Sequence, residues 1–109
     1  MTTPSSLAAW LHTRTPSPPD ALAIRIGAMT AGVADAPASA DALVACAERA
    51  MSALLHDGCL TRSSALDLLA VDALITYAFE VAADEPERIE EHAERALAVM
   101  ARLTEPYPA

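Results

Sequence analysis

The residue types best suited to chemistry gather in the segment ALDLLAVDALITYAFEVAAD, residues 65–84. Asp72, Thr76 and Glu80 follow one another at intervals of four, so they lie along one side of a helix, with Ser64 on the same side. We call these four residues the polar strip. Carboxylates on a bundle helix can bind a metal ion or transfer a proton. Asp72 and Glu80, however, are separated by about 12 Å at a rise of roughly 1.5 Å per residue. Such a site therefore needs ligands from a second helix.

Asp72 also has a purely structural interpretation. An acid among apolar neighbours is usually paired with a base, here Arg25, Arg49 or Arg62, or is partly solvated. Structural ion pairs outnumber functional sites among such acids. We therefore expect Asp72 to face an arginine or water.

A second group of possible ligands surrounds His92, which is flanked by Glu90, Glu91 and Glu94. Metal-binding carboxylate bundles place Glu and His three residues apart on one helix. Here the residue three positions before His92 is Ile89, so that pattern is incomplete. We predict instead that these charged residues form the solvated side of an amphipathic helix.

His56 and Cys59 form a His-x-x-Cys pair, which is half of a zinc site. Completing it requires His12, His92, Cys46 or a second protomer, and a Cys-His nucleophilic site lacks an identifiable orienting group. We favour a histidine at a helix end and a small cysteine in a turn, with Cys46 as a reduced thiol inside a helix. The expectation is no catalytic residue, no metal and no cofactor, with Asp72, Glu80, His92, His56 and Cys59 as the weaker metal-ligand candidates.

The elements that carry these residues are predicted to be helices throughout. Capping residues and apolar spacing predict a short helix opened by Ser5 or Ser6, a second over about 18–31 with Ser17 as its cap, and a third opened by Ser39 or Asp41. Gly58 then provides a turn, and Ser64 with Asp67 resembles a capping box for the fourth helix. The segment DEPE, 84–87, opens the fifth.

The fold class predicted from this pattern is all-α, a compact bundle of about five helices with the fourth at its centre. The fourth helix is central because its apolar residues cover most of its circumference. The short first helix is expected to dock through Trp10, because an isolated helix of that length is unstable in water. A length of 109 residues fits one domain, 1–109, with residues 1–4 and 105–109 frayed.

Composition excludes several classes of function. The chain has 15 acids against 7 bases, a net charge of -8, so its surface should repel nucleic acid and anionic membrane. No window of about 18 residues is free of charge, which argues against a membrane span. The N-terminal segment does not read as a signal peptide, so the cytoplasm is the expected location.

Our hypothesis about function is based on the wide apolar surface of the fourth helix. Covering it on all sides within one small chain is difficult, so a partner should cover part of it. We expect a non-enzymatic helical interaction module, self-associating as a homodimer or small oligomer. The interface candidates are Leu68, Val71, Ile75, Tyr77 and Phe79. One alternative is a small-molecule or metal-binding bundle that uses the polar strip, and a second is an acidic regulator that binds a basic protein surface.

Overall fold

The computed structural model describes residues 6–57 and 62–104, and within these ranges the regular structure is entirely helical. The α-helices are α1 (Leu7–His12), α2 (Asp20–Thr30), α3 (Ala40–Asp57), α4 (Arg62–Ala83) and α5 (Ile89–Ala101). Three short 3-10 turns accompany them: η1 (Ala31–Val33), η2 (Pro86–Arg88) and η3 (Arg102–Thr104). The predicted all-α bundle of about five helices is confirmed.

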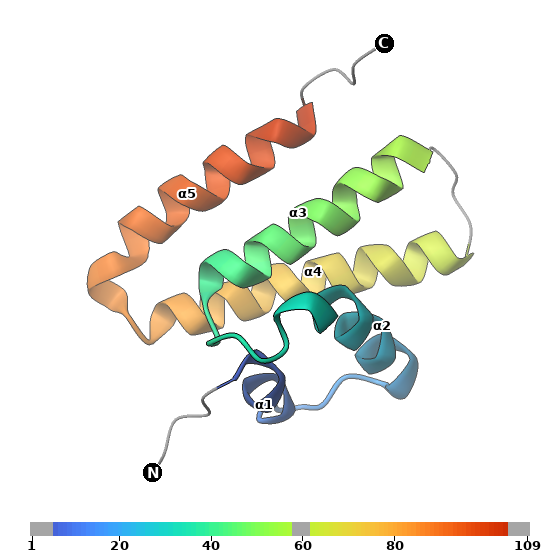
Figure 1. Ribbon diagram of the computed structural model, residues 1–109, viewed down its shortest axis with the longest axis horizontal. Coiled ribbons are helices and arrows are strands. Elements are labelled where there is room, and N and C mark those ends of the chain that lie inside the picture. Colours follow the sequence, from blue (N-terminus) through green and yellow to red (C-terminus); the bar gives the residue numbers. More distant parts are fainter. Residues whose placement is uncertain (1–5, 58–61, 105–109) are drawn as a thin grey trace.

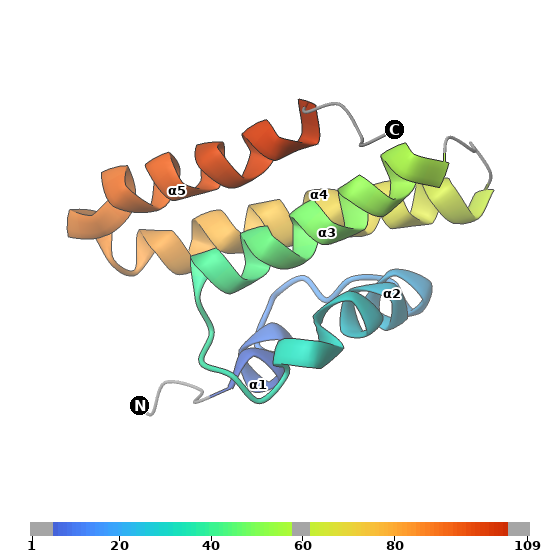
Figure 2. The same cartoon turned by 45° about the horizontal axis from the view of Figure 1, so that its top comes forward.

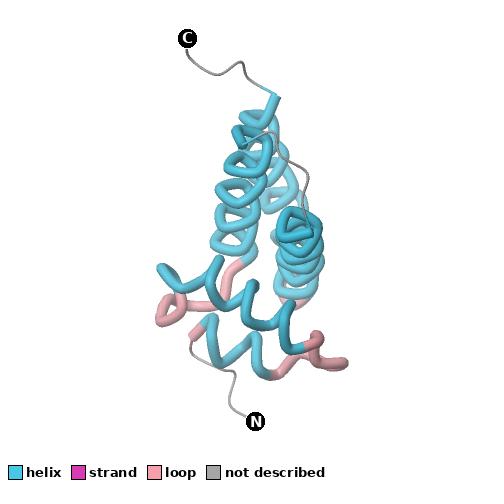
Figure 3. Tube along the Cα trace, turned by 90° about the vertical axis from the view of Figure 1, so that its right-hand side faces the viewer, coloured by secondary structure: helices cyan, strands magenta, loops and turns pink. Residues whose placement is uncertain are grey.

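The helices form three layers. α3 and α4 lie side by side and antiparallel in the middle, and α5 lies on one side of this pair (Figures 1 and 2). α1 and α2 lie on the other side and run across the pair, which is clearest when the molecule is viewed along its length (Figure 3). α4 is central because it contacts α2, α3 and α5 and also receives Trp10 of α1.

Two of the predicted helix caps are formed by serines. The Ser6 hydroxyl accepts a hydrogen bond from the Ala9 amide at 3.1 Å, and the Ser39 hydroxyl accepts one from the Ala42 amide at 3.0 Å. Each satisfies a backbone donor that a helix start otherwise leaves without a partner. α1 and α3 therefore begin where their local sequence predicts.

Two other predicted starts are wrong. α2 begins at Asp20 with Pro19 in the capping position, not Ser17, because the proline supplies the fixed backbone angle of an entry residue. α4 begins at Arg62, so Ser64 lies inside the helix and the capping box does not form. Asp67 instead pairs with Arg25 of α2 at 3.1 Å. The predicted turn at Gly58 and Cys59 lies outside the described residues.

Small side chains bring α3 and α4 close together. Leu43 and Ala47 on α3, and Ala70 and Leu74 on α4, are fully buried at 0% exposure. Alanines at the contact let the two backbones approach, and the leucines fill the space beside them. Cys46 is also buried inside α3, the helix position predicted for it, and it is a free cysteine. The core is therefore the seam of α3 and α4, extended by Leu7, Trp10 and Ile26 from the layer of α1 and α2.

Trp10 docks α1 onto α4, which confirms the prediction for this residue. Its ring is buried and meets the ring of Tyr77 edge to face, with centroids 5.9 Å apart. The guanidinium of Arg14 lies 3.9 Å from the centroid of the Trp10 ring, and the same group pairs with Glu80 at 2.8 Å. Aromatic and cation–π contacts of this kind stabilise a short helix that cannot persist alone.

Candidate functional site

The polar strip of α4 does not converge on one site. Asp72 is exposed and makes no ion pair among the described residues, while its backbone carbonyl accepts a hydrogen bond from the Thr76 hydroxyl at 3.0 Å. Glu80 is paired with Arg14 of α1. Of the two environments expected for Asp72, solvent is the one observed. Arg25, one of its expected partners, binds Asp67 instead.

His92 corrects the prediction that the charged residues of α5 are all solvated. Its side chain is only 10% exposed, and its Nδ1 lies 3.7 Å from a carboxylate oxygen of Asp41 on α3, too far for a hydrogen bond. Arg95 pairs with the other oxygen of Asp41 at 3.4 Å and with Glu91 at 3.6 Å. These contacts attach the first half of α5 to the start of α3.

The metal-ligand candidates are spread over the molecule. His56 is exposed in the last turn of α3. It is at the opposite end of that helix from Asp41, the residue beside which His92 of α5 lies. Asp72 and Glu80 lie on α4 as described above, and Cys59 falls outside the described residues. Over residues 6–57 and 62–104, His, Cys, Asp and Glu side chains form no group of three or more that could hold a metal ion.

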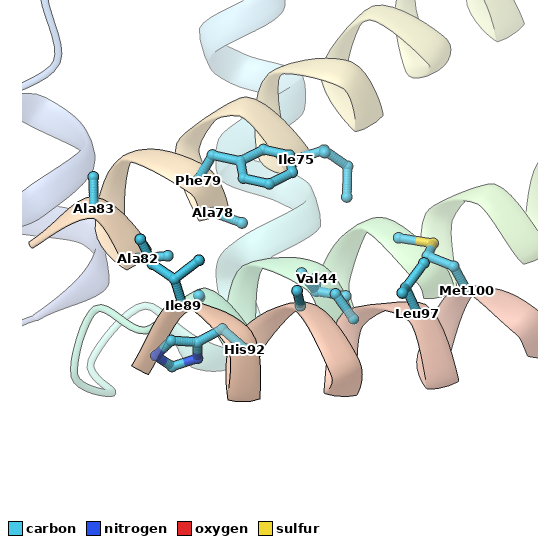
Figure 4. A pocket seen from close by; sticks show the side chains of 13 residues that line it. Val44, Ile75, Ala78, Phe79, Ala82, Ala83, Ile89, His92, Leu97 and Met100 are labelled. Atoms are coloured by element: carbon cyan, nitrogen blue, oxygen red, sulfur yellow. The ribbon is translucent and has the colours of Figure 1, made fainter. Parts of the chain in front are cut away.

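A groove lies between α4 and α5, with α3 as its floor (Figure 4). Its volume is about 390 Å³, within the range of binding sites in proteins. Phe79 stands on the α4 rim at 72% exposure, while Leu97 and Ile89 stand on the α5 rim at 71% and 47%. Ala40 and Val44 of α3 form part of the floor. Among the described residues that line it, His92 is the single titratable one.

The groove exists because the facing sides of α4 and α5 carry short side chains. Ala78 and Ala82 on α4 line the groove together with Ala93 and Ala96 on α5, and an alanine side chain is too short to fill the space between the two helices. α5 therefore has no fully buried residue, although apolar residues form a stripe along it. In this respect α5 differs from α3 and α4, whose alanines Ala47 and Ala70 are fully buried.

The five interface candidates fall into different environments. Ile75 lines the groove, Phe79 stands on its rim, and Leu68 is 40% exposed further along α4. Val71 is partly buried against the core, and Tyr77 is covered by Trp10 of the same chain. Three of the five therefore lie on or beside the open surface.

Sequence reasoning missed the contribution of α5. Leu97 and Ile89 belong to the apolar stripe of the amphipathic fifth helix, yet both are exposed large apolar residues. The available signal was the alternation of alanine with larger residues in that stripe, because alanines at the contact positions leave the larger neighbours at the edges.

Comparisons with known proteins do not assign this chain to a family. Comparison with family models, curated proteins and solved structures found no match to this chain. In the part of the chain that the structure describes, no helix combines the length and the apolar character needed to cross a membrane.

Proposed function

We propose that this protein is a non-enzymatic helical interaction module that self-associates through the groove between α4 and α5. The observation that carries the proposal is the exposure of Phe79 and Leu97, at 72% and 71%, on the two rims of an apolar groove. Scattered exposed apolar residues are normal on a protein surface, but a contiguous apolar hollow with aromatic and aliphatic rims is typical of an interaction site.

A second copy of the chain can fill the groove with its own exposed apolar side chains. Each copy carries both a groove and two protruding apolar side chains, so two copies related by a two-fold axis can insert rims into grooves reciprocally. Covering a large exposed side chain such as Phe79 contributes roughly 1.5–3 kcal/mol. α5 also gains the apolar cover that it lacks within one chain.

The lining of the groove supports a binding role rather than a catalytic one. Nucleophilic catalysis needs a nucleophile with a base in hydrogen-bond reach, and metal catalysis needs several ligands. His92 is the one titratable residue among the described lining residues, and the polar strip does not line the groove. The groove therefore gives no support to a small-molecule or metal-binding site built on Asp72, Thr76 and Glu80. A cytoplasmic location, compatible with the free thiol of Cys46, stays part of the proposal.

Light scattering coupled to size exclusion tests this function in wild-type protein and two variants. Wild type should rise in average mass from one copy toward two between low and high micromolar concentration. Phe79→Asp should stay monomeric, because it places a charge in the apolar contact. Ile24→Asp is the matched control, since Ile24 is equally exposed at 74% but lies on α2, in the opposite layer.

Circular dichroism should give all three proteins the same helical content, because both substituted side chains are exposed. A wild-type mass of one copy at every concentration would overturn the proposed self-association. So would an equal loss of association in Phe79→Asp and Ile24→Asp, because the contact would then not be specific to the groove.

A further inference from the structure

The rims of the groove carry charge as well as apolar side chains. Asp72 lies seven residues before Phe79 on α4, and Glu90 lies seven residues before Leu97 on α5. Seven residues are about two helical turns, so each acid is on the same side of its helix as the apolar rim residue and roughly 10 Å from it along the axis. Asp72 and Glu90 are both exposed.

Among the described residues these rim acids have no basic partner, unlike Glu91 on α5 and Glu80 on α4. Glu91 on α5 is held by Arg88 at 3.4 Å and by Arg95 at 3.6 Å. Asp72 and Glu90 make no ion pair in the described ranges, and neither does Glu94, one turn before Leu97. The groove therefore has an apolar interior and uncompensated negative charge along its edges.

The two rim acids lie at opposite ends of the groove. α4 and α5 run antiparallel (Figure 1), so the end of the groove that holds Asp72 on one rim is far from the end that holds Glu90 on the other. Glu90 is near the connection between the two helices, close to Ile89, which lines that end. An occupant lying along the groove thus meets one acid on each flank.

Self-association covers the apolar interior of the groove but leaves the negative charge of its rims unpaired. A second copy covering the groove brings a second set of rim acids near the first, and the whole chain carries a net charge of -8. Like charges brought together at an interface oppose binding, most strongly at low salt. The homodimer should accordingly be weak and should tighten with added salt.

We infer that the preferred occupant of the groove is an amphipathic helix of another protein, with arginine or lysine residues on both flanks of its apolar stripe. This inference rests on the proposed use of the groove as a docking surface. A helix fits because two helices already form the walls, and its apolar residues at intervals of three and four can enter the groove. Its basic flanks then pair with Asp72 and Glu90, and it displaces the weaker second copy.

Two synthetic peptides of equal length test the inference with the full chain. Both carry the same leucine and alanine stripe on a helix, but one has lysine and arginine on its flanks and the other has glutamate. Binding is measured by fluorescence anisotropy of labelled peptide at low and high salt. The basic peptide should bind the wild-type protein at least tenfold more tightly than the acidic one, and this difference should shrink as salt increases.

Protein variants separate specific pairing from general attraction to an acidic protein. Asp72→Asn with Glu90→Gln should weaken the basic peptide by roughly two- to fivefold for each acid removed. Asp20→Asn with Asp35→Asn removes the same charge from exposed positions at the start of α2 and just after η1, outside α4 and α5, and should change affinity much less. Phe79→Asp should prevent binding of either peptide by disrupting the apolar contact.

Equal affinity for the two peptides, or equal losses from the two double variants, would overturn the inference. Absence of binding by the basic peptide would overturn it as well. If the protein dimerises through Phe79 while the peptides fail to bind, the inference fails and the proposed function stands. If the basic peptide binds at the groove of a protein that stays monomeric, the inference stands and self-association fails.

Discussion

The pKa of Tyr77 is changed by the contacts that hold α1 on α4. Its ring is partly buried and meets Trp10 edge to face, and the charges of Glu80 and Arg14 act on it. Burial raises the pKa of Tyr77 above its ordinary value, the negative charge of Glu80 raises it further, and the positive charge of Arg14 opposes both. The folded protein therefore favours the neutral phenol.

The pH dependence follows from the sign of this shift. Because the pKa of Tyr77 is higher in the folded than in the unfolded chain, its contribution to stability is complete below pH about 10 and is lost as pH rises through the folded pKa. Urea unfolding across this alkaline range should show the loss in wild type and a smaller loss in Tyr77→Phe. An identical loss in both proteins would contradict the assignment.

A spectroscopic titration checks the cause of the same shift. Tyrosinate absorbance in Tyr107→Phe follows Tyr77 alone, since these are the two tyrosines of the chain. Adding Glu80→Gln should lower the pKa of Tyr77, because it removes a negative neighbour and leaves Arg14 without its counter-ion. No change in the titration midpoint would exclude Glu80 as a cause.

At the scale of elements, alanine has opposite consequences in two helix pairs. Between α3 and α4, buried alanines such as Ala47 and Ala70 allow direct contact of the helices. Between α4 and α5, exposed alanines such as Ala83 and Ala93 line an open gap. The two pairs differ in how closely the helices approach. α5 packs mainly on α3, where His92 and Arg95 contact Asp41, and it makes few contacts with α4.

One substitution made at both places tests this difference. Ala47→Leu should destabilise the fold by about 1–3 kcal/mol, because a larger side chain has no space in the seam. Ala93→Leu should cost less than about 0.5 kcal/mol, because its methyl group faces the groove and is exposed. Denaturant unfolding measures both, and equal costs would show that the groove is not open in solution.

The elements were predictable where their determinants are local. Ser6 and Ser39 cap helices through hydrogen bonds to residues three positions ahead, so the sequence alone locates them. The start of α4 was not predictable, because Asp67 is used by Arg25 of another helix rather than by its own first turn. Trp10 was predictable as a docking residue, but its partner Tyr77 had been assigned to an interface.

At the scale of the molecule, the sequence indicated an excess of apolar surface but not its location. The fourth helix does have more apolar circumference than its neighbours cover, as Phe79 and Leu68 show. The groove itself depends on how far α5 lies from α4, which is set by contacts among three helices and not by any local pattern. Leu97 could be found only once that placement was known.

The distribution of acidic residues is a second property of the whole molecule. The net charge of -8 could be explained by solubility alone. Its arrangement is more specific, since unpaired acids flank the apolar groove while Arg88 and Arg95 pair with Glu85, Glu91 and Asp41. The expected acidic-regulator role and the expected interaction module thus become two aspects of one proposed surface.

Hydrogen exchange of the full chain, measured by mass spectrometry at low and high protein concentration, tests the central claim most directly. Docking at the groove should slow exchange of the α5 amides several-fold at high concentration, because a covered helix opens less often. Exchange in α2, in the opposite layer, should not change with concentration. Phe79→Asp should abolish the slowing in α5. Exchange in α5 that is independent of concentration, or slowing confined to α2, would contradict self-association through the groove.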